Sequence, residues 1–375
     1  MRARDLGITV GTGRPGGLNA ITDVADVRVG HCTLVAGDGP LVRGQGPVRT
    51  GVSVVLPHGG DVWDRQVFAG HHRLNGNGEM TGLSWLEEFG TLMSPIGLTN
   101  THSVGVVRDA LVLHEVERRA TEELYWGLPV VAETWDGMLS DCDGFHVRPE
   151  HVAAAIEDAR PGPVAEGGVG SGTGMICHGF KGGIGTASRV SEDTGGGEHT
   201  VGVLVQANHG VRRRLSVNGA PVGLAVDDAA VPLPELPGAR RVDEGSGSVI
   251  VIVATDAPLL PHQCRRLAQR AGLGIARTGG TGENSSGDLF LAFATGNRVA
   301  ASDGAEPPAL QELRMLSDAY IDPLFHATVE ATEEAVLNAL VAATTMTGRD
   351  GVTAHALPHD LLVSALDARG LRKLA

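Results

Sequence analysis

A loop of small and acidic residues runs directly into a buried β-strand between positions 243 and 258, and this junction constrains the fold most strongly. The five residues from Val249 to Val253 are all β-branched, which predicts a strand covered on both faces. Gly247 and Ser248 stand where the loop becomes the strand. A serine at the mouth of a core strand is well placed to react, and the glycine before it leaves its own carbonyl open to a nucleophile.

Two interpretations of this junction stay open from these residues alone. The simpler one is a flexible Gly/Ser loop before a core strand, which is common. The alternative is a self-processing junction, at which Ser248 attacks the carbonyl of Gly247, the chain breaks, and Ser248 becomes an N-terminal nucleophile. Its own α-amine could then act as the base, because an α-amine titrates nearer neutral pH than a lysine does.

The composition is that of an ordinary globular protein. The chain has 375 residues, of which 42% are hydrophobic and 20% charged, enough for one large domain or two average ones. A formal net charge of -14 argues against nucleic acid as a partner. No apolar run approaches the length of a membrane span, and residues 1–7 lack the apolar core of a secretory signal, so we expect no membrane partner and a cytoplasmic location.

Metal and disulfide chemistry have no clear signal in the sequence. No CxxC spacing links the four cysteines, which are Cys32, Cys142, Cys177 and Cys264. The adjacent His71 and His72 stand in a Gly- and Asn-rich stretch without a third ligand at metal-site spacing, so a pocket wall or an exposed loop is favoured there. We therefore expect no metal site.

Strands alternate with helices along the chain without a repeat of fixed length, which predicts a layered α/β architecture with paired sheets between helices. The expected helices cover residues 83–89, 109–124, 149–159, 261–271, 310–319, 322–345 and 359–366. Buried strands are expected at residues 51–57, 200–207, 249–253 and 289–295. The proline-containing segment 224–244 is the best candidate for an exposed linker, and it leads directly to Gly247.

Polar side chains at strand ends are the first candidate site residues, because sites gather there in layered α/β proteins. Glu133 and Trp135 follow a buried strand, where a site and a surface turn fit equally well. Asn208 ends the strand 200–207 and could donate its amide to a developing oxyanion, although an asparagine there is more often a turn former.

Seven motifs in this order together resemble the family of D-aminopeptidases/esterases and β-peptidyl aminopeptidases. They cover residues 76–82, 170–174, 179–185, 205–208, 247–248, 254–259 and 285–288. Each motif alone is weak, but the set is specific, and the resemblance runs from about residue 6 to the C-terminus.

The resemblance implies a self-cleaving hydrolase with a four-layer αββα sandwich, similar to N-terminal-nucleophile hydrolases but with distinct connectivity. Residues 1–375 would form a single catalytic domain that cuts itself into pieces 1–247 and 248–375. The pieces would stay together and assemble as a homo-oligomer, usually a tetramer of such pairs. The substrates would be small peptides, amides or esters with a free amine, and no cofactor is implied.

The family's site residues can be carried over where the motifs match. By this resemblance Ser248 is the nucleophile, freed by cutting after Gly247, and Asn208 stabilises the oxyanion. Ser286 and Asp288 match a Ser-x-acid pair that orients the nucleophile, although the family's acid is often glutamate, one methylene longer.

The same resemblance assigns residues that would bind the substrate. Glu133 matches an acid that recognises the free amine of the substrate, which would explain cleavage at the N-terminus. Trp135 stands where some members have tyrosine, and a tryptophan does not supply the phenol hydroxyl of those members. Asn77 and Glu79 of the first motif are expected to line the substrate site.

Other functions stay open on the sequence. The same fold class includes self-cleaving acetyltransferases of arginine biosynthesis (ornithine acetyltransferase-like) and endo-hydrolases of nylon oligomers, but both typically present threonine as the nucleophile. An uncleaved binding or scaffold protein is the non-enzyme alternative. No motif encodes a preference for L-, D- or β-amino acids.

Overall fold

The computed structural model describes residues 1–122, 125–193, 196–238, 247–301 and 309–372. The acidic part of the junction, residues 243–246, therefore lies outside the described residues, whereas Gly247 and Ser248 lie within them. Part of the linker expected at 224–244 also falls outside them.

Two sheets of unequal size form the middle of the molecule. The smaller sheet has four strands in the order β1 (Arg28–Ala36), β2 (Val48–Leu56), β5 (Ile96–Asn100) and β6 (Val130–Thr134). The larger sheet has six strands in the order β4 (Thr91–Leu92), β3 (Arg65–Arg73), β12 (Ser286–Ala300), β11 (Gly247–Thr255), β10 (Thr200–Asn208) and β9 (Gly183–Val190). The neighbours pair antiparallel except for two parallel pairs, β5 with β6 and β11 with β12.

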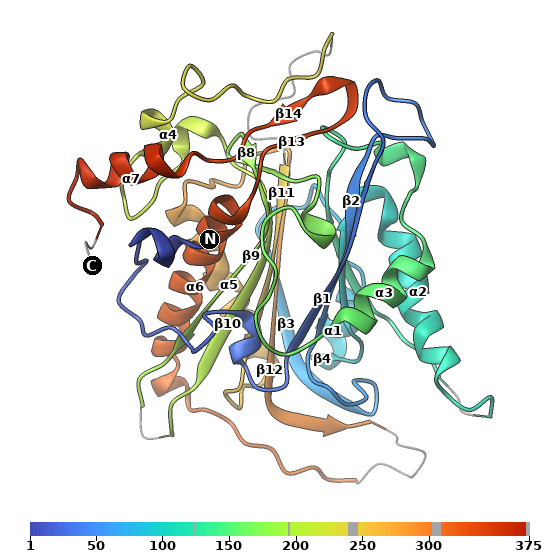
Figure 1. The fold of residues 1–375 in the computed structure, drawn as a ribbon. Coiled ribbons are helices and arrows are strands. Elements are labelled where there is room, and N and C mark those ends of the chain that lie inside the picture. Colours follow the sequence, from blue (N-terminus) through green and yellow to red (C-terminus); the bar gives the residue numbers. More distant parts are fainter. Residues whose placement is uncertain (123–124, 194–195, 239–246, 302–308, 373–375) are drawn as a thin grey trace.

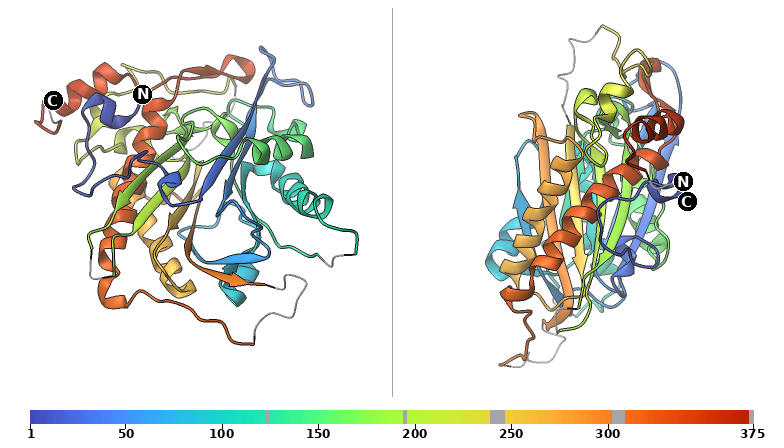
Figure 2. Two further views of the ribbon diagram at one scale, coloured as in Figure 1. Left: turned by 60° about the horizontal axis from the view of Figure 1, so that its bottom comes forward. Right: turned by 90° about the vertical axis from the view of Figure 1, so that its left-hand side faces the viewer.

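Helices cover the outer face of each sheet (Figures 1 and 2). The helices α2 (Val104–Glu117) and α3 (Pro149–Asp158) pack on the smaller sheet, and α5 (Pro261–Arg277) and α6 (Asp322–Ala342) pack side by side on the larger one. A third apolar cluster fills the space between the two sheets. The predicted four-layer αββα sandwich is therefore confirmed.

The remaining elements are short and lie around this sandwich. They are α1 (Leu83–Phe89), α4 (Val222–Ala225), α7 (His359–Asp367) and the two-stranded pairs β7 (Ile176–Cys177) with β8 (Phe180–Lys181) and β13 (Met346–Thr347) with β14 (Thr353–Ala354). In the part of the chain that is described, no helix is both long and apolar enough to cross a membrane.

Strand β11 shows why a run of β-branched residues folds at the centre of this sandwich. Val249, Val251 and Val253 face the helical layer, whereas Ile250 and Ile252 face the space between the sheets. All five side chains are fully buried. Both faces of the strand therefore need apolar residues that fit a pleated surface.

Some expected elements differ from those observed. The helix expected at 310–319 is wrong, because residues 311–317 have no regular secondary structure and bond to the end of β12. Residues His71 and His72 lie in strand β3, paired with β12, and not in a loop. Helix α5 continues six residues past the expected end at Ala271. The absence of a Cβ at Gly274 lets α5 approach the Val329 carbonyl of α6 closely.

Candidate active site

Ser248 is held by the two strands on either side of it. In β11 it pairs with Asn208 of β10 and with Gly287 of β12. Its Oγ donates a hydrogen bond to the carbonyl oxygen of Gly247 at 2.7 Å and accepts one from the amide of Gly287 at 3.2 Å. The serine hydroxyl therefore rests against the peptide bond that self-processing would break.

Two glycines allow the backbone to close around this serine. A Cβ at Gly247 would lie 2.0 Å from the carbonyl oxygen of Asn208, and a Cβ at Gly287 would lie 2.4 Å from that of Asn77. Real Cβ atoms do not approach other atoms so closely, so a side chain at either position would force the strand and the loop apart. The glycines thus fix how β10 and the loop 75–79 pack beside Ser248.

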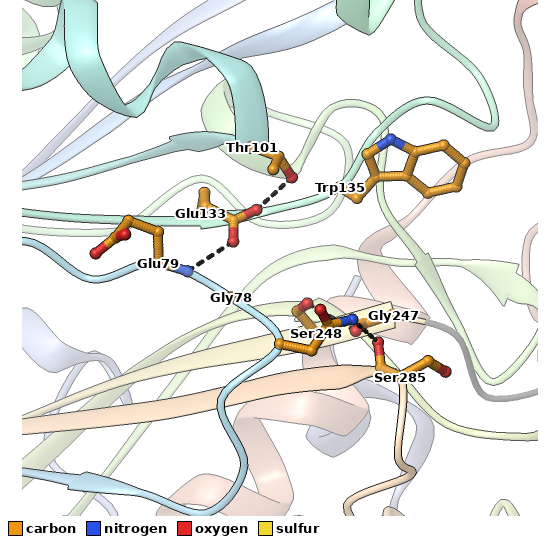
Figure 3. A pocket seen from close by; sticks show the side chains of 9 residues that line it. Gly78, Glu79, Thr101, Glu133, Trp135, Gly247, Ser248 and Ser285 are labelled. Carbon is orange, nitrogen blue, oxygen red and sulfur yellow. Dashed lines mark hydrogen bonds between the residues drawn. The ribbon is translucent and has the colours of Figure 1, made fainter.

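A cavity of about 530 Å³ opens above Ser248, between the ends of β6 and β11 (Figure 3). The cavity brings together six of the predicted site residues, which are Asn77, Glu79, Glu133, Trp135, Gly247 and Ser248. It is also lined by three residues that the sequence did not single out for substrate binding, namely Gly78, Thr101 and Ser285. The cavity is therefore lined by predicted residues from three places: the smaller sheet, the loop before α1 and the larger sheet.

Glu133 lies on the side of the cavity formed by the smaller sheet. Its carboxylate accepts hydrogen bonds from the Thr101 hydroxyl and, at 2.9 Å, from the backbone amide of Glu79. Burial raises the pKa of Glu133 above its ordinary value, the hydrogen bonds from Thr101 and Glu79 offset part of this rise, and the charge of Glu79 adds to it. A buried carboxylate that still needs a positive partner is suited to binding an ammonium group.

Thr101 could have been found from its position in the sequence. It directly follows β5, which runs parallel to β6, and Thr99 pairs with Glu133. Because the carboxyl ends of neighbouring parallel strands meet at the same edge of a sheet, a polar residue there is a candidate site residue.

Asn208 lies at the end of β10 directly opposite Ser248, but it does not line the cavity. Its amide nitrogen donates to the carbonyl of Trp135 at 2.9 Å, and its amide oxygen accepts from the amide of Ile176 at 2.8 Å. One of its two N–H hydrogens is left for another acceptor. The side chain is thus fixed in orientation from both sides.

Ser286 and Asp288 lie on β12, on either side of the Gly287 that pairs with Ser248. The hydroxyl of Ser286 donates to Asp288 at 2.6 Å, and both side chains are buried. Burial raises the pKa of Asp288, while the hydrogen bond from Ser286 lowers it in part. The structure therefore brings Ser286 and Asp288 together as a pair, next to Ser248 but outside the cavity.

Among the described residues, one trio of potential metal ligands lies close together, and it consists of Cys177, His178 and His209. None of the three lines the cavity.

Comparisons with known proteins agree with this geometry. The sequence model of Peptidase family S58 matches residues 19–354. The chain belongs to this family. A β-peptidyl aminopeptidase BapA from Sphingosinicella microcystinivorans is 51% identical over 100% of the chain and 93% of that protein. The BapA of Sphingosinicella xenopeptidilytica is 44% identical over 99% of the chain and 92% of that protein.

Two solved aminopeptidase structures superpose on nearly the whole chain. A Burkholderia β-aminopeptidase has a TM-score of 0.91 at 52% identity and covers 100% of both chains. The L-aminopeptidase D-Ala-esterase/amidase of Ochrobactrum anthropi, described as a variant of the Ntn hydrolase fold, has a TM-score of 0.89 at 43% identity and covers 99% of both. The predicted class of enzyme, an aminopeptidase of the Ntn-hydrolase type, is therefore confirmed.

Proposed function

We propose that this S58 aminopeptidase cuts itself between Gly247 and Ser248 and then releases N-terminal β-amino acids from small peptides, amides or esters. The observation that carries the proposal is the position of Ser248 Oγ, which touches the Gly247 carbonyl and lines the same cavity as Glu133. One side chain is thereby placed both for self-processing and for the hydrolysis of a bound substrate.

Self-processing starts at the contact between these two residues. Ser248 Oγ attacks the carbonyl carbon of Gly247, the C–N bond breaks, and the nitrogen of Ser248 takes up the proton that the hydroxyl loses. Water then hydrolyses the resulting ester, which leaves a carboxylate on Gly247 and a free α-amine on Ser248. The pieces 1–247 and 248–375 result.

Hydrolysis of the substrate reuses the same hydroxyl. The α-amine of Ser248, or the Ser286–Asp288 pair beside it, accepts the hydroxyl proton as Oγ attacks the substrate carbonyl. Asn208 and backbone amides such as that of Gly287 stabilise the oxyanion. The leaving amine takes up a proton, and water hydrolyses the acyl-enzyme.

Glu133 selects substrates with a free amine. Its carboxylate faces the cavity beside Glu79, so an ammonium group can bind there with a charge-assisted hydrogen bond (Figure 3). A β-amino acid carries its amine one methylene farther from the carbonyl than an α-amino acid does. The distance between the Glu133 carboxylate and Ser248 Oγ therefore decides whether an α- or a β-amino acid substrate places its carbonyl at Ser248.

The names of the most similar reported relatives support the preference for β-amino acids. Two relatives, at 51% and 52% identity, are named a β-peptidyl aminopeptidase and a β-aminopeptidase, and a third, at 44%, is also a β-peptidyl aminopeptidase. The L-aminopeptidase D-Ala-esterase/amidase is 43% identical. A cytoplasmic location and a tetramer of processed pairs stay predictions.

The first experiment measures the intact mass of freshly purified wild-type protein, with Ser248→Ala and Ser285→Ala beside it. We expect wild type and Ser285→Ala to give pieces 1–247 and 248–375, and Ser248→Ala to stay whole. Ser285 also lines the cavity and lies beside the junction (Figure 3), so this variant tests whether loss of a neighbouring hydroxyl is enough to stop the cut. A single 375-residue species from all three proteins would reject self-processing and leave a binding role.

The second experiment compares p-nitroanilides of β-alanine, L-alanine and D-alanine on the processed protein. We expect the β-alanine compound to have the highest kcat/KM and its N-acetylated form to be inert. A higher kcat/KM for an α-amino acid would reject the β preference and leave the aminopeptidase assignment untouched.

A further inference from the structure

A buried trio of sulfur and imidazole side chains lies behind the active site. Cys177 ends β7, His178 follows it, and His209 directly follows β10. Cys177 and His178 are fully buried, and His209 is 3% exposed. One potential ligand atom from each of the three lies within 4.8 Å of the other two.

One ring nitrogen of His178 has no hydrogen-bond partner among the described residues. Its Nδ1 lies 3.1 Å from the carbonyl oxygen of Val211, and a carbonyl can only accept, so Nδ1 carries the proton. Its Nε2 then carries no proton but a lone pair, and this nitrogen has no hydrogen-bond partner among the described residues. Buried polar atoms are nearly always satisfied, so this nitrogen needs an explanation.

The spacing of the atoms fits a metal ion. The Sγ of Cys177 lies 3.9 Å from Nδ1 of His209. Zinc bonds of about 2.3 Å to sulfur and about 2.0 Å to nitrogen place the two ligand atoms about 3.5 Å apart at a tetrahedral angle. The bond from His178 to Val211 is also the backbone contact that typically orients a metal-bound histidine.

We propose that Cys177, His178 and His209 form a site for a zinc-like transition-metal ion. One thiolate and two imidazoles suit zinc, whereas magnesium and calcium prefer oxygen ligands. On binding, Cys177 loses its thiol proton to solvent and the thiolate bonds the metal, while both imidazoles bind through lone pairs. A water molecule completes the four ligands.

The site would brace the strand end that carries Asn208. Ile176, next to Cys177, donates its amide to the side chain of Asn208, and the amide of His178 donates to the carbonyl of His209 at 2.7 Å. A metal bound to both segments ties β7 to the end of β10. None of the ligands lines the cavity, so the inference does not depend on the mechanism proposed for Ser248.

The test measures metal content in untagged, processed protein expressed in medium supplemented with zinc or with cobalt. After gel filtration in buffer with EDTA, we expect inductively coupled plasma mass spectrometry to find about one zinc ion per chain. The cobalt form should show the charge-transfer absorption of a Co–thiolate bond. Cys177→Ser should lose this absorption, and its zinc content should fall at least tenfold.

Two further variants keep the result unambiguous. His209→Gln removes a ligand but keeps the cysteine. The zinc content of this variant should also be at least tenfold lower than that of wild type. Cys264→Ser changes another fully buried cysteine, on α5, and should keep the metal. Wild-type protein free of metal from both media, or zinc held equally by Cys177→Ser, would overturn the proposal. Because the readout is metal content, a failure of the proposed peptidase mechanism would appear separately, in the cleavage and activity assays.

Discussion

The side chain of Asn208 is held by Trp135 and Ile176, and its backbone pairs with Ser248 at the start of β11. If Asn208 is the oxyanion donor that we propose, replacing it with alanine in processed protein should lower kcat by about 10²–10³-fold, or about 3–4 kcal/mol of barrier. Steady-state kinetics on a p-nitroanilide measure this effect. The mass of the variant must first show that processing still occurs.

Gln206 provides the matched control on the same face of β10. It is fully buried and donates to the Thr99 carbonyl and the Thr134 hydroxyl of the smaller sheet. Gln206→Ala should therefore lower Tm while leaving kcat within a few-fold of wild type. If Asn208→Ala behaves in the same way, its role is to hold the strands and not to stabilise the oxyanion.

The raised pKa of Glu133 should be visible in the pH profile of the reaction. A protonated Glu133 cannot bind the substrate ammonium ion electrostatically, so kcat/KM should fall as the pH drops through the pKa of this residue in the free enzyme. Since burial raises that pKa, this acidic limb should lie above the ordinary value of 4.5. Glu133→Gln should abolish the limb and raise KM.

Glu79→Gln tests the electrostatic part of this argument. The charge of Glu79 raises the pKa of Glu133, so its removal should move the acidic limb to lower pH while substrate binding persists. A limb that survives in Glu133→Gln, or that moves upward in Glu79→Gln, would contradict the assignment.

At the scale of elements, a buried ion pair joins β9 to α6. Arg189 donates to Glu334 at 2.7 Å, and the two side chains are 1% and 0% exposed. Burial raises the pKa of Glu334, but Arg4, Arg189 and Asn19 outweigh it, so the pKa in the folded protein is below the ordinary value. This contribution to stability is present above the unfolded pKa of about 4.3 and is lost as the pH falls through the lower, folded pKa.

Arg189→Met should therefore destabilise the protein by about 3–5 kcal/mol at neutral pH, because it leaves a charge buried with fewer partners. Urea unfolding of this variant in the uncleaved Ser248→Ala background measures the change in the free energy of unfolding for a single chain. Arg14 and Glu198 form an exposed pair nearby on the chain, with side chains 61% and 54% exposed, so Arg14→Met should cost less than about 1 kcal/mol. Equal costs for the two variants would contradict the argument.

The elements also show what a sequence can predict. Strand β11 and helix α1 follow from local residue patterns, because burial on both faces and a regular apolar spacing leave a direct signal. The segment 311–317 does not, since its groups bond to Asn297 and Ala300 of β12, which are distant contacts that a local pattern cannot show. Cys177 and His209 are similarly 32 positions apart, and only the pairing around β10 brings them together.

For the site, the motif resemblance supplied the roles and the fold supplied the grouping. Ser248 and Glu133 come from different sheets, and no spacing in the sequence indicates that they share a cavity. The family assigned both in advance. Thr101, whose hydroxyl bonds Glu133, carried only the weak signal of a polar residue after a strand.

At the scale of the whole molecule, the expected cut divides the chain but not the sheet. Strands β3, β4, β9 and β10 come from piece 1–247, whereas β12 and nearly all of β11 come from piece 248–375. In the sheet, β11 and β12 lie between β3 and β10 (Figure 1). Arg189 and Glu334, on opposite pieces, add a buried ion pair across the division. The pieces cannot separate without breaking the core of the larger sheet.

The cleaved protein should therefore behave as one folded unit. Its two pieces should elute together in gel filtration and unfold in a single transition, separating only in guanidinium chloride. On dilution from denaturant, the uncleaved Ser248→Ala protein should refold at a rate independent of concentration, because its strands are already linked. The cleaved pieces should refold more slowly at lower concentration, since β11 and β12 must first meet β3 and β10 in a bimolecular step. Two separate native peaks, or refolding of the pieces that is independent of concentration, would show that each piece folds by itself.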